Sequence, residues 1–190
     1  MRVFDFDGTI YDGESSVDFF KYTLRRHPKN IRFLPRVLYM LSRYKRLKVS
    51  SDELLTALER YGAEFLSSIG DINAEISSFW DINEHKIKQF YLNDRRADDV
   101  ILSASPDFLI NEAARRLGVN TVIASKFDLE NGKVIDLCYH TNKCERFRAV
   151  FPDMKIDEFY TDSENDSAVF ALADKVFMVT GNKIYRRDGI

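Results

Sequence analysis

Short apolar runs separated by helical patterns make up the second half of the chain. Each run has the continuous hydrophobic or β-branched character of a buried strand. The four runs are Val100–Leu102, Thr121–Ala124, Glu158–Thr161 and Lys175–Val179. Helices are expected before Gly118, before Pro152 and after Asp166. Strands that alternate with helices predict a parallel sheet with helices on both of its faces.

The N-terminal half follows a different pattern. Arg2–Phe6 predicts one short strand, which a turn at Asp7-Gly8-Thr9 ends. From about Asp12 to Asn93 the periodicity is wholly helical. A helical block of this length therefore separates the first strand from the second.

This order of elements predicts an α/β fold with an insertion. We expect a Rossmann-like, three-layer α/β/α core with a parallel sheet, formed by residues 1–11 and 96–190. Residues 12–95 would form an all-helical cap domain. An insertion at this point would hang over the carboxyl ends of the strands, where open α/β sheets bind ligands.

Several local signals refine the element boundaries. Ser15 and Ser16 can cap a first helix, and Ser50–Glu53 is a capping box for a later one that Gly62 would end. Asn131-Gly132 is the strongest hairpin signal in the chain.

Composition is that of a folded globular protein, with 190 residues, 45% of them hydrophobic, and a net charge of −2. The charge is unevenly distributed. Residues 21–50 contain ten bases and no acids, which leaves 18 bases against 30 acids elsewhere.

Two cysteines are too few for a disulfide framework. No secretory signal or membrane span is recognisable, so we expect a soluble, cytoplasmic protein. The three histidines have no metal-ligand spacing.

Asp5 and Asp7 are the first candidates for chemistry. Residues two apart on a strand share a face, so both carboxylates leave the strand in the same direction. Two carboxylates this close repel each other unless a cation or a shared proton separates them. The alternative is an ordinary acidic turn, and Asp-x-Asp-Gly is also common in calcium loops.

Four later residues stand at the boundaries that a catalytic sheet would use. Ser103 is expected to end the second core strand, and Lys143 to lie in a turn before a helix. Asp162 and Asp166 follow the fourth core strand. Singly, the serine and the aspartates could be helix caps and the lysine a solvated surface charge. Together, and in this order, they favour a catalytic site.

These motifs resemble those of the haloacid dehalogenase superfamily, and within it the phosphoserine-phosphatase-like branch with a helical cap. The first motif is DFDGT at 5–9, the second is VILS at 100–103, the third is Lys143 and the fourth is DSEND at 162–166. Relatives often have glycine beside the lysine, where this chain has Asn142 and Cys144.

The resemblance implies a Mg²⁺-dependent phosphatase. Asp5 would be the nucleophile that forms an aspartyl phosphate, and Asp7 the general acid and base. Dehalogenases lack an equivalent of Asp7, so its presence favours phosphoryl chemistry. The residues implied to hold Mg²⁺ are Asp5, Asp7 through its backbone carbonyl, Asp162 and, near the coordination shell, Asp166. Those implied to bind substrate are Ser103, Ala104, Lys143 and Asn165.

Two features bear on the substrate. Glu14 has the spacing from Asp5 at which phosphoserine phosphatases read an amino group, although an acid at a helix start is also favoured by the helix dipole. Leu34–Lys48 has an apolar and a basic face. The segments Phe20–Pro28 and Tyr160–Ser163 look similar to phosphatidylglycerophosphate phosphatases. The resemblance thus implies a phosphoserine-like metabolite or a lipid phosphate as the substrate, and it assigns neither.

The basic segment 21–50 has two interpretations. It could contact an anionic membrane peripherally, or it could be a cap helix with a solvated basic face that steers phosphorylated substrates. The alternatives to a phosphatase are a phosphotransferase or mutase of the same superfamily, and a non-catalytic binding protein. No base-reading element points to nucleic acid.

Overall fold

A seven-stranded, mostly parallel sheet forms the centre of the computed structural model, which describes residues 1–36, 38, 39, 62 and 64–187. The strand order is β4-β3-β2-β1-β5-β6-β7. The central pairs are parallel, and only β4 and β7 run antiparallel to their neighbours. The strands are β1 (Arg2–Phe4), β2 (Val100–Pro106), β3 (Thr121–Asp128), β4 (Lys133–Asp136), β5 (Ile156–Thr161), β6 (Ala173–Thr180) and β7 (Lys183–Arg186).

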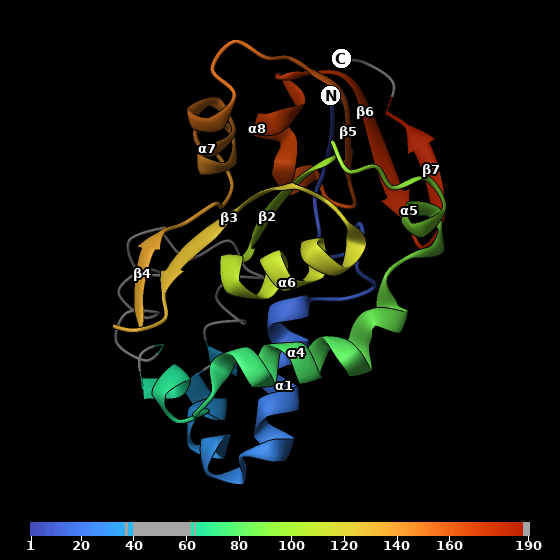
Figure 1. Ribbon diagram of the computed structural model, residues 1–190. Coiled ribbons are helices and arrows are strands. Elements are labelled where there is room, and N and C mark those ends of the chain that lie inside the picture. Colours follow the sequence, from blue (N-terminus) through green and yellow to red (C-terminus); the bar gives the residue numbers. More distant parts are fainter. Residues whose placement is uncertain (37, 40–61, 63, 188–190) are drawn as a thin grey trace.

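Helices cover both faces of this sheet (Figure 1). Those between β1 and β2 in the chain are α1 (Ser15–Arg26), η1 (Pro28–Phe33), α4 (Ile72–Asn83), η2 (Glu84–Lys86) and α5 (Gln89–Asp94). Those that follow β2 are α6 (Asp107–Leu117), α7 (Asn142–Val150), η3 (Glu164–Asp166) and α8 (Ser167–Phe170). The expected α/β core with its parallel sheet is confirmed. The division into a core and a cap at residues 12 and 95 stays a prediction.

Alternation along the strands creates two hydrophobic layers. Val100 and Leu102 pack in the layer that includes α7 and α8, whereas Ile101, between them, packs in the layer that includes α6. Val3 and Phe4 divide in the same way. Each central strand is therefore buried on both faces, which explains its continuous apolar sequence.

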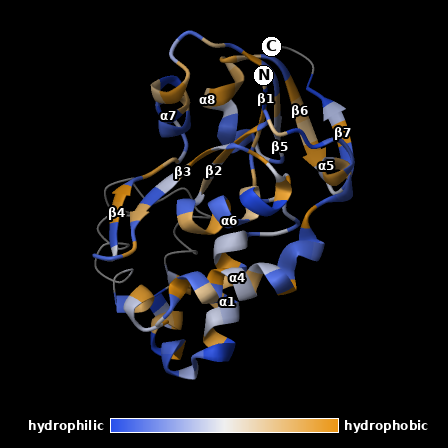
Figure 2. Cartoon of the chain, viewed as in Figure 1, coloured by the Kyte–Doolittle hydropathy of each residue, from blue (hydrophilic) through white to orange (hydrophobic). Residues whose placement is uncertain are grey.

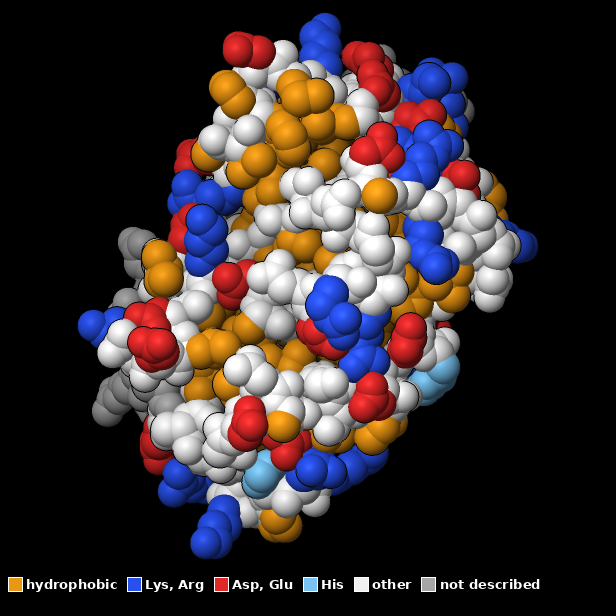
Figure 3. Space-filling view, viewed as in Figure 1, with side chains coloured by type: hydrophobic (Ala, Val, Ile, Leu, Met, Phe, Trp, Pro, Cys, Tyr) orange, Lys and Arg blue, Asp and Glu red, His pale blue; other side chains and the backbone are white. Residues whose placement is uncertain are grey.

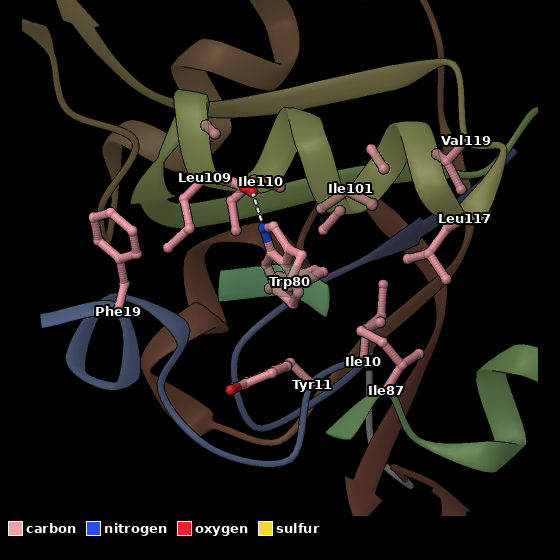
Figure 4. Close-up of a cluster of buried hydrophobic side chains, with 14 of the residues drawn as sticks. Ile10, Tyr11, Phe19, Trp80, Ile87, Ile101, Leu109, Ile110, Leu117 and Val119 are labelled. Atoms are coloured by element: carbon pink, nitrogen blue, oxygen red, sulfur yellow. Dashed lines mark hydrogen bonds between the residues drawn. The ribbon is translucent and has the colours of Figure 1, made fainter. Parts of the chain in front are cut away.

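Trp80 joins α4, one of the helices before β2, to α6 of the core. This side chain of α4 is 1% exposed, and its indole N–H donates to the Leu109 carbonyl of α6 at 2.9 Å (Figure 4). Figure 2 shows hydrophobic and hydrophilic residues alternating along α1 and α4, as expected of helices with one buried face.

Several boundary predictions were wrong. The helical pattern from Asp12 to Asn93 is interrupted where Ile87 forms an isolated antiparallel bridge with Tyr11. Neither Ser15 nor Ser16 caps α1, because the N-cap is Glu14 and it makes no side-chain capping bond. Gly62, which was expected to end a helix, is itself helical, and both of its neighbours lie outside the described residues. The hairpin at Asn131-Gly132 is confirmed by the antiparallel β3–β4 pair.

The basic segment is partly paired with acids from other elements. Arg26 lies 2.9 Å from Glu75, and Arg32 lies 3.2 Å from Glu64. Acidic and basic side chains are interspersed on the face shown in Figure 3. The capping box at Ser50–Glu53 and most of the basic amphipathic pattern, Leu34–Lys48, lie outside the described residues. None of the helices in the described ranges has the length and hydrophobicity needed to cross a bilayer.

Candidate active site

The carboxyl ends of β1 and β5 bring the first and fourth motifs together. Phe4 is in register with Tyr160, and the Asp5 N–H donates to the Tyr160 carbonyl at 2.9 Å. Asp5 therefore leaves its strand beside Thr161 and Asp162, although more than 150 residues of chain separate them. Parallel pairing alone is enough to explain this meeting, because neighbouring parallel strands end at the same edge.

A tight turn holds Asp162 against the first motif. Gly8 has a φ of +74°, and a Cβ atom there would lie only 2.1 Å from Asp162 Oδ2. The Thr9 hydroxyl lies 3.4 Å from both Asp5 Oδ2 and Asp162 Oδ1. Glycine is thus required both by the left-handed backbone and by the approach of a carboxylate.

Lys143 connects two carboxylates inside the protein. Its Nζ lies 2.8 Å from Asp5 Oδ1 and 2.7 Å from Asp166 Oδ1, and the side chain is 5% exposed. Lys143 is in the first turn of α7, and not in a turn before it as expected from the sequence. Phe147, four residues later on the same inward face, is fully buried. The helix therefore points the ammonium group into the sheet edge.

The charges in this cluster shift one another's ionisation. Burial acts to lower the pKa of Lys143, yet the two carboxylates beside it raise that pKa above its ordinary value. Burial raises the pKa of Asp5 to about 8, although the Lys143 ammonium opposes the shift. Lys143 therefore stays positively charged, and it compensates the charge of the Asp5 carboxylate only in part.

Asp7 is held by groups from two other elements. The Ser105 hydroxyl donates to Asp7 Oδ2 at 2.6 Å, and the Ser15 N–H, at the start of α1, donates to Asp7 Oδ1 at 2.5 Å. The Ser16 hydroxyl lies 2.7 Å from that of Ser105. Burial raises the pKa of Asp7, while the Ser105 and Ser15 bonds act to lower it. Asp7 itself supplies the capping acceptor that Ser15 and Ser16 were expected to provide.

The second motif is extended beyond its predicted end. Ser103 lies within β2, which runs on to Pro106 with a register shift between Leu102 and Pro106. The buried Ser103 hydroxyl accepts the Ser105 N–H at 3.1 Å. Ala104 and Ser105, but not Ser103, line the cavity beside Asp5. The irregularity after Leu102 thus directs Ser105 towards Asp7.

The remaining predicted residues lie around the same cavity, which has a volume of about 490 Å³. Glu14, Asn165 and Asp166 are among its lining residues, together with Asp5, Asp7, Lys143 and Asp162. Glu14 already interacts with other residues of the chain. The backbone N–H of Asn165 donates to the Ser163 hydroxyl oxygen at 3.1 Å, and Asn165 is exposed.

Sequence reasoning missed Ser105 and Lys88. Lys88 is 7% exposed, and its ammonium donates to the Gly8 carbonyl. Burial lowers its pKa, against the opposing effects of Asp12 and Asp162. A lysine in a stretch with helical periodicity gives no signal of this contact. For Ser105, the only signal was its place two residues after Ser103.

The donor set suits a hard divalent cation. Across the described ranges, no three acidic, histidine or cysteine side chains form a ready-made metal site. The ligand set implied by the resemblance consists of the Asp5 and Asp162 side chains and the Asp7 carbonyl, with Asp166 near the coordination shell. Asp166 Oδ1 lies 2.7 Å from Lys143 Nζ. Asp5 uses Oδ1 for Lys143 and directs Oδ2 towards Thr9, which also neighbours Asp162. Four carboxylates near one buried lysine leave negative charge that a cation such as Mg²⁺ would offset.

Comparison with families and curated proteins places the chain among hydrolases. The model of the haloacid dehalogenase-like hydrolase family matches residues 3–171. Over 94 residues the chain is 31% identical to Protein CicA from two strains of Caulobacter vibrioides. That match covers 46% of this chain and 40% of each relative, so less than half of the relatives' length is represented.

Solved structures share the fold over nearly the whole chain. A protein of unknown function from Bordetella pertussis Tohama I has a TM-score of 0.73 at 18% identity, covering 93% of this chain and 87% of that one. A phosphoserine phosphohydrolase-like protein from Francisella tularensis subsp. tularensis SCHU S4 has a TM-score of 0.58 at 15% identity, covering 93% and 86%. At these identities the likeness concerns the fold.

The raised pKa of Asp5 predicts a pH-dependent stability in the absence of divalent cations. Because its folded pKa lies near 8 and its ordinary value is 3.8, the stability that protonated Asp5 contributes is fully present below pH 3.8 and is lost as pH rises through 8. Asn mimics the protonated form. We expect the Tm of Asp5→Asn to exceed that of the wild type increasingly from pH 5 to 8, by at least about 3 °C, the shift for about 1 kcal/mol at this size.

Thermal unfolding with EDTA measures this difference. Asp153→Asn, a change at an exposed aspartate, is the matched control and should give a constant difference across the range. A constant difference for Asp5→Asn as well would contradict the proposed ionisation.

Proposed function

The chain belongs to the haloacid dehalogenase-like hydrolase family, and on this basis we propose that it is a Mg²⁺-dependent phosphatase that hydrolyses a phosphomonoester through a phospho-aspartate. The observation that carries the proposal is the buried contact of Asp5 with Lys143 in the lining of a cavity that Asp7 also lines. A nucleophile, an adjacent acid and a fixed positive charge are the parts that phosphoryl transfer needs.

In the first half-reaction Asp5 is the nucleophile. A carboxylate oxygen of Asp5 attacks phosphorus, and the bond between phosphorus and the alcohol oxygen breaks. Asp7 gives its proton to the departing oxygen, so an alcohol leaves and an aspartyl phosphate remains. Burial favours the protonated form of Asp7 that this step requires.

In the second half-reaction Asp7 reverses its role. As a carboxylate it takes a proton from water, and the water oxygen attacks phosphorus. The bond between phosphorus and Asp5 breaks, which releases inorganic phosphate and restores both aspartates. Lys143 orients Asp5 and stabilises negative charge on the phosphoryl oxygens. Bound at Asp5, Asp162 and the Asp7 carbonyl, Mg²⁺ would supply further charge stabilisation.

Ser105 has a geometry suited to both states of Asp7. When Asp7 is ionised, the Ser105 hydroxyl donates to it at 2.6 Å. When Asp7 is protonated, Ser105 can accept and turn its own proton to Ser16, 2.7 Å away, because either hydroxyl of that pair can be the donor. Ser105 is thus a positioning residue for an acid that must also act as a base.

Substitution of the nucleophile tests the proposal directly. Asp5→Asn should lower phosphate release from a generic phosphomonoester by about a thousandfold or more, because removing a nucleophile disables the whole pathway. EDTA should have the same effect on the wild type, with Mg²⁺ restoring activity. Asp153→Asn, a change at an exposed residue outside the four motifs, should retain wild-type turnover. Substantial turnover by Asp5→Asn would reject the assignment, and phosphate recovered on a second alcohol would favour a phosphotransferase.

Loss of the Ser105 hydroxyl should shift the alkaline limb of the pH profile of kcat/KM. Because that hydroxyl stabilises the Asp7 carboxylate, Ser105→Ala should raise the pKa of Asp7 and move the limb to higher pH. We expect a shift of about one unit, since a hydrogen bond to a charged group contributes about 1.5–3 kcal/mol. Ser105→Thr should restore the wild-type limb. Ser125→Ala, a change in the same cavity without contact to Asp7, is the control, and an unmoved limb in Ser105→Ala would refute this role.

A further inference from the structure

The cavity is lined by two kinds of side chain. Asp5, Asp7 and Lys143 are among the polar ones. Five of its phenylalanines come from the inserted helices and the core, and we call these five the aromatic wall. The aromatic wall consists of Phe20, Phe33, Phe65, Phe108 and Phe127.

The inserted segment supplies one side of this wall. Phe65 lies between two other rings, with its centroid 5.4 Å from that of Phe20 and 5.6 Å from that of Phe33. Phe20 belongs to α1 and Phe33 to η1, and both are buried. Phe65 is only half-buried, so part of its ring remains available to a ligand.

The core supplies the other side. Phe108, at the start of α6, and Phe127, in β3, meet edge to face with centroids 5.6 Å apart. Both are half-buried. Phe108 is three residues after Ser105, whose hydroxyl contacts Asp7. The wall therefore begins close to the place where a leaving alcohol would depart from phosphorus.

Full charges are scarce along the rest of the lining. Outside the carboxylate cluster and Lys143, the described lining residues that carry one are Glu14 and Arg36. Both already interact with other parts of the chain, and Arg36 lies 4.0 Å from Glu64. A small zwitterionic alcohol such as serine would leave the exposed parts of Phe65, Phe108 and Phe127 in contact with water.

Resting on the proposed function, we infer that the leaving alcohol carries an apolar chain or ring, which the aromatic wall buries while the phosphate lies at Asp5. Burial of apolar surface is favourable roughly in proportion to its area, and aromatic rings provide much area at a small entropic cost. The cavity of about 490 Å³ is within the range of about 300–1,000 Å³ typical of sites that enclose small molecules.

Binding of alkylphosphonates tests this inference without relying on turnover. Their carbon–phosphorus bond is not a phosphoester, so calorimetry with Mg²⁺ measures affinity alone. From methyl- to hexylphosphonate we expect affinity to rise by up to about fourfold per methylene, which corresponds to about 0.8 kcal/mol each. Benzylphosphonate, set against hexylphosphonate, distinguishes a ring-bearing alcohol from a chain-bearing one. Equal affinity across the series would overturn the inference.

Variants locate the effect. Phe65→Ser should reduce the ratio of hexyl- to methylphosphonate affinity by about fivefold or more, corresponding to about 1 kcal/mol of lost apolar contact. Phe65→Leu should retain most of the ratio, which guards against a folding defect in the serine variant. Phe90→Ser is the matched control, because Phe90 is also half-buried but does not line the cavity. A wild-type ratio in Phe65→Ser would refute the role of the wall.

Hydrolysis assays separate the two proposals. Methyl phosphate, hexyl phosphate and phosphoserine are compared by release of inorganic phosphate. If none is hydrolysed while phosphonate affinity still rises with chain length, the proposed function fails and the apolar site stands. If all are hydrolysed but phosphoserine has the highest kcat/KM, the phosphatase stands and the apolar leaving group is wrong.

Discussion

The buried ammonium group of Lys143 offsets the repulsion between carboxylates that the fold brings close together. Lys143 contacts Asp5, which follows β1, and Asp166, which lies beyond β5. Because Lys143 belongs to α7, its two contacts join three elements at one point, and its loss would leave both buried carboxylates without a countercharge. It also leaves one oxygen of Asp5 directed towards Thr9 and Asp162. The fold thus keeps a reactive carboxylate in place while part of its charge remains uncompensated.

The inserted helices complete the site from the opposite side. Ser15, at the start of α1, donates its N–H to Asp7, and Phe20 and Phe33 form part of the aromatic wall. Phe19 of α1 packs edge to face on Phe79 of α4, and Trp80 of α4 bonds to α6, so α1 is joined to the core through α4. The core would therefore determine which bond is broken, while the insertion would help to determine which alcohol is accepted.

The sequence was informative where local chemistry and topology coincide. Apolar runs such as Val100–Leu102 predicted central strands, and the order of elements predicted the sheet edge where Asp5 and Asp162 meet. Contacts made by side chains over long separations were not predictable. The Ser105–Asp7 bond joins residues 98 apart through a strand irregularity, and no periodic pattern encodes it. The inward position of Lys143 on α7 was not predictable either, because a lysine is rarely fully buried unless it is paired.

The proposed mechanism depends on transfer of the phosphoryl group to Asp5. This step can be detected by acid-quenching the wild-type enzyme during turnover of methyl phosphate and analysing its peptides by mass spectrometry. We expect the mass of one phosphoryl group on the peptide that contains Asp5, and none on that peptide when Mg²⁺ is withheld. A phosphoryl group on the peptide that contains Ser103 and Ser105, or turnover without any phosphorylated peptide, would contradict the mechanism.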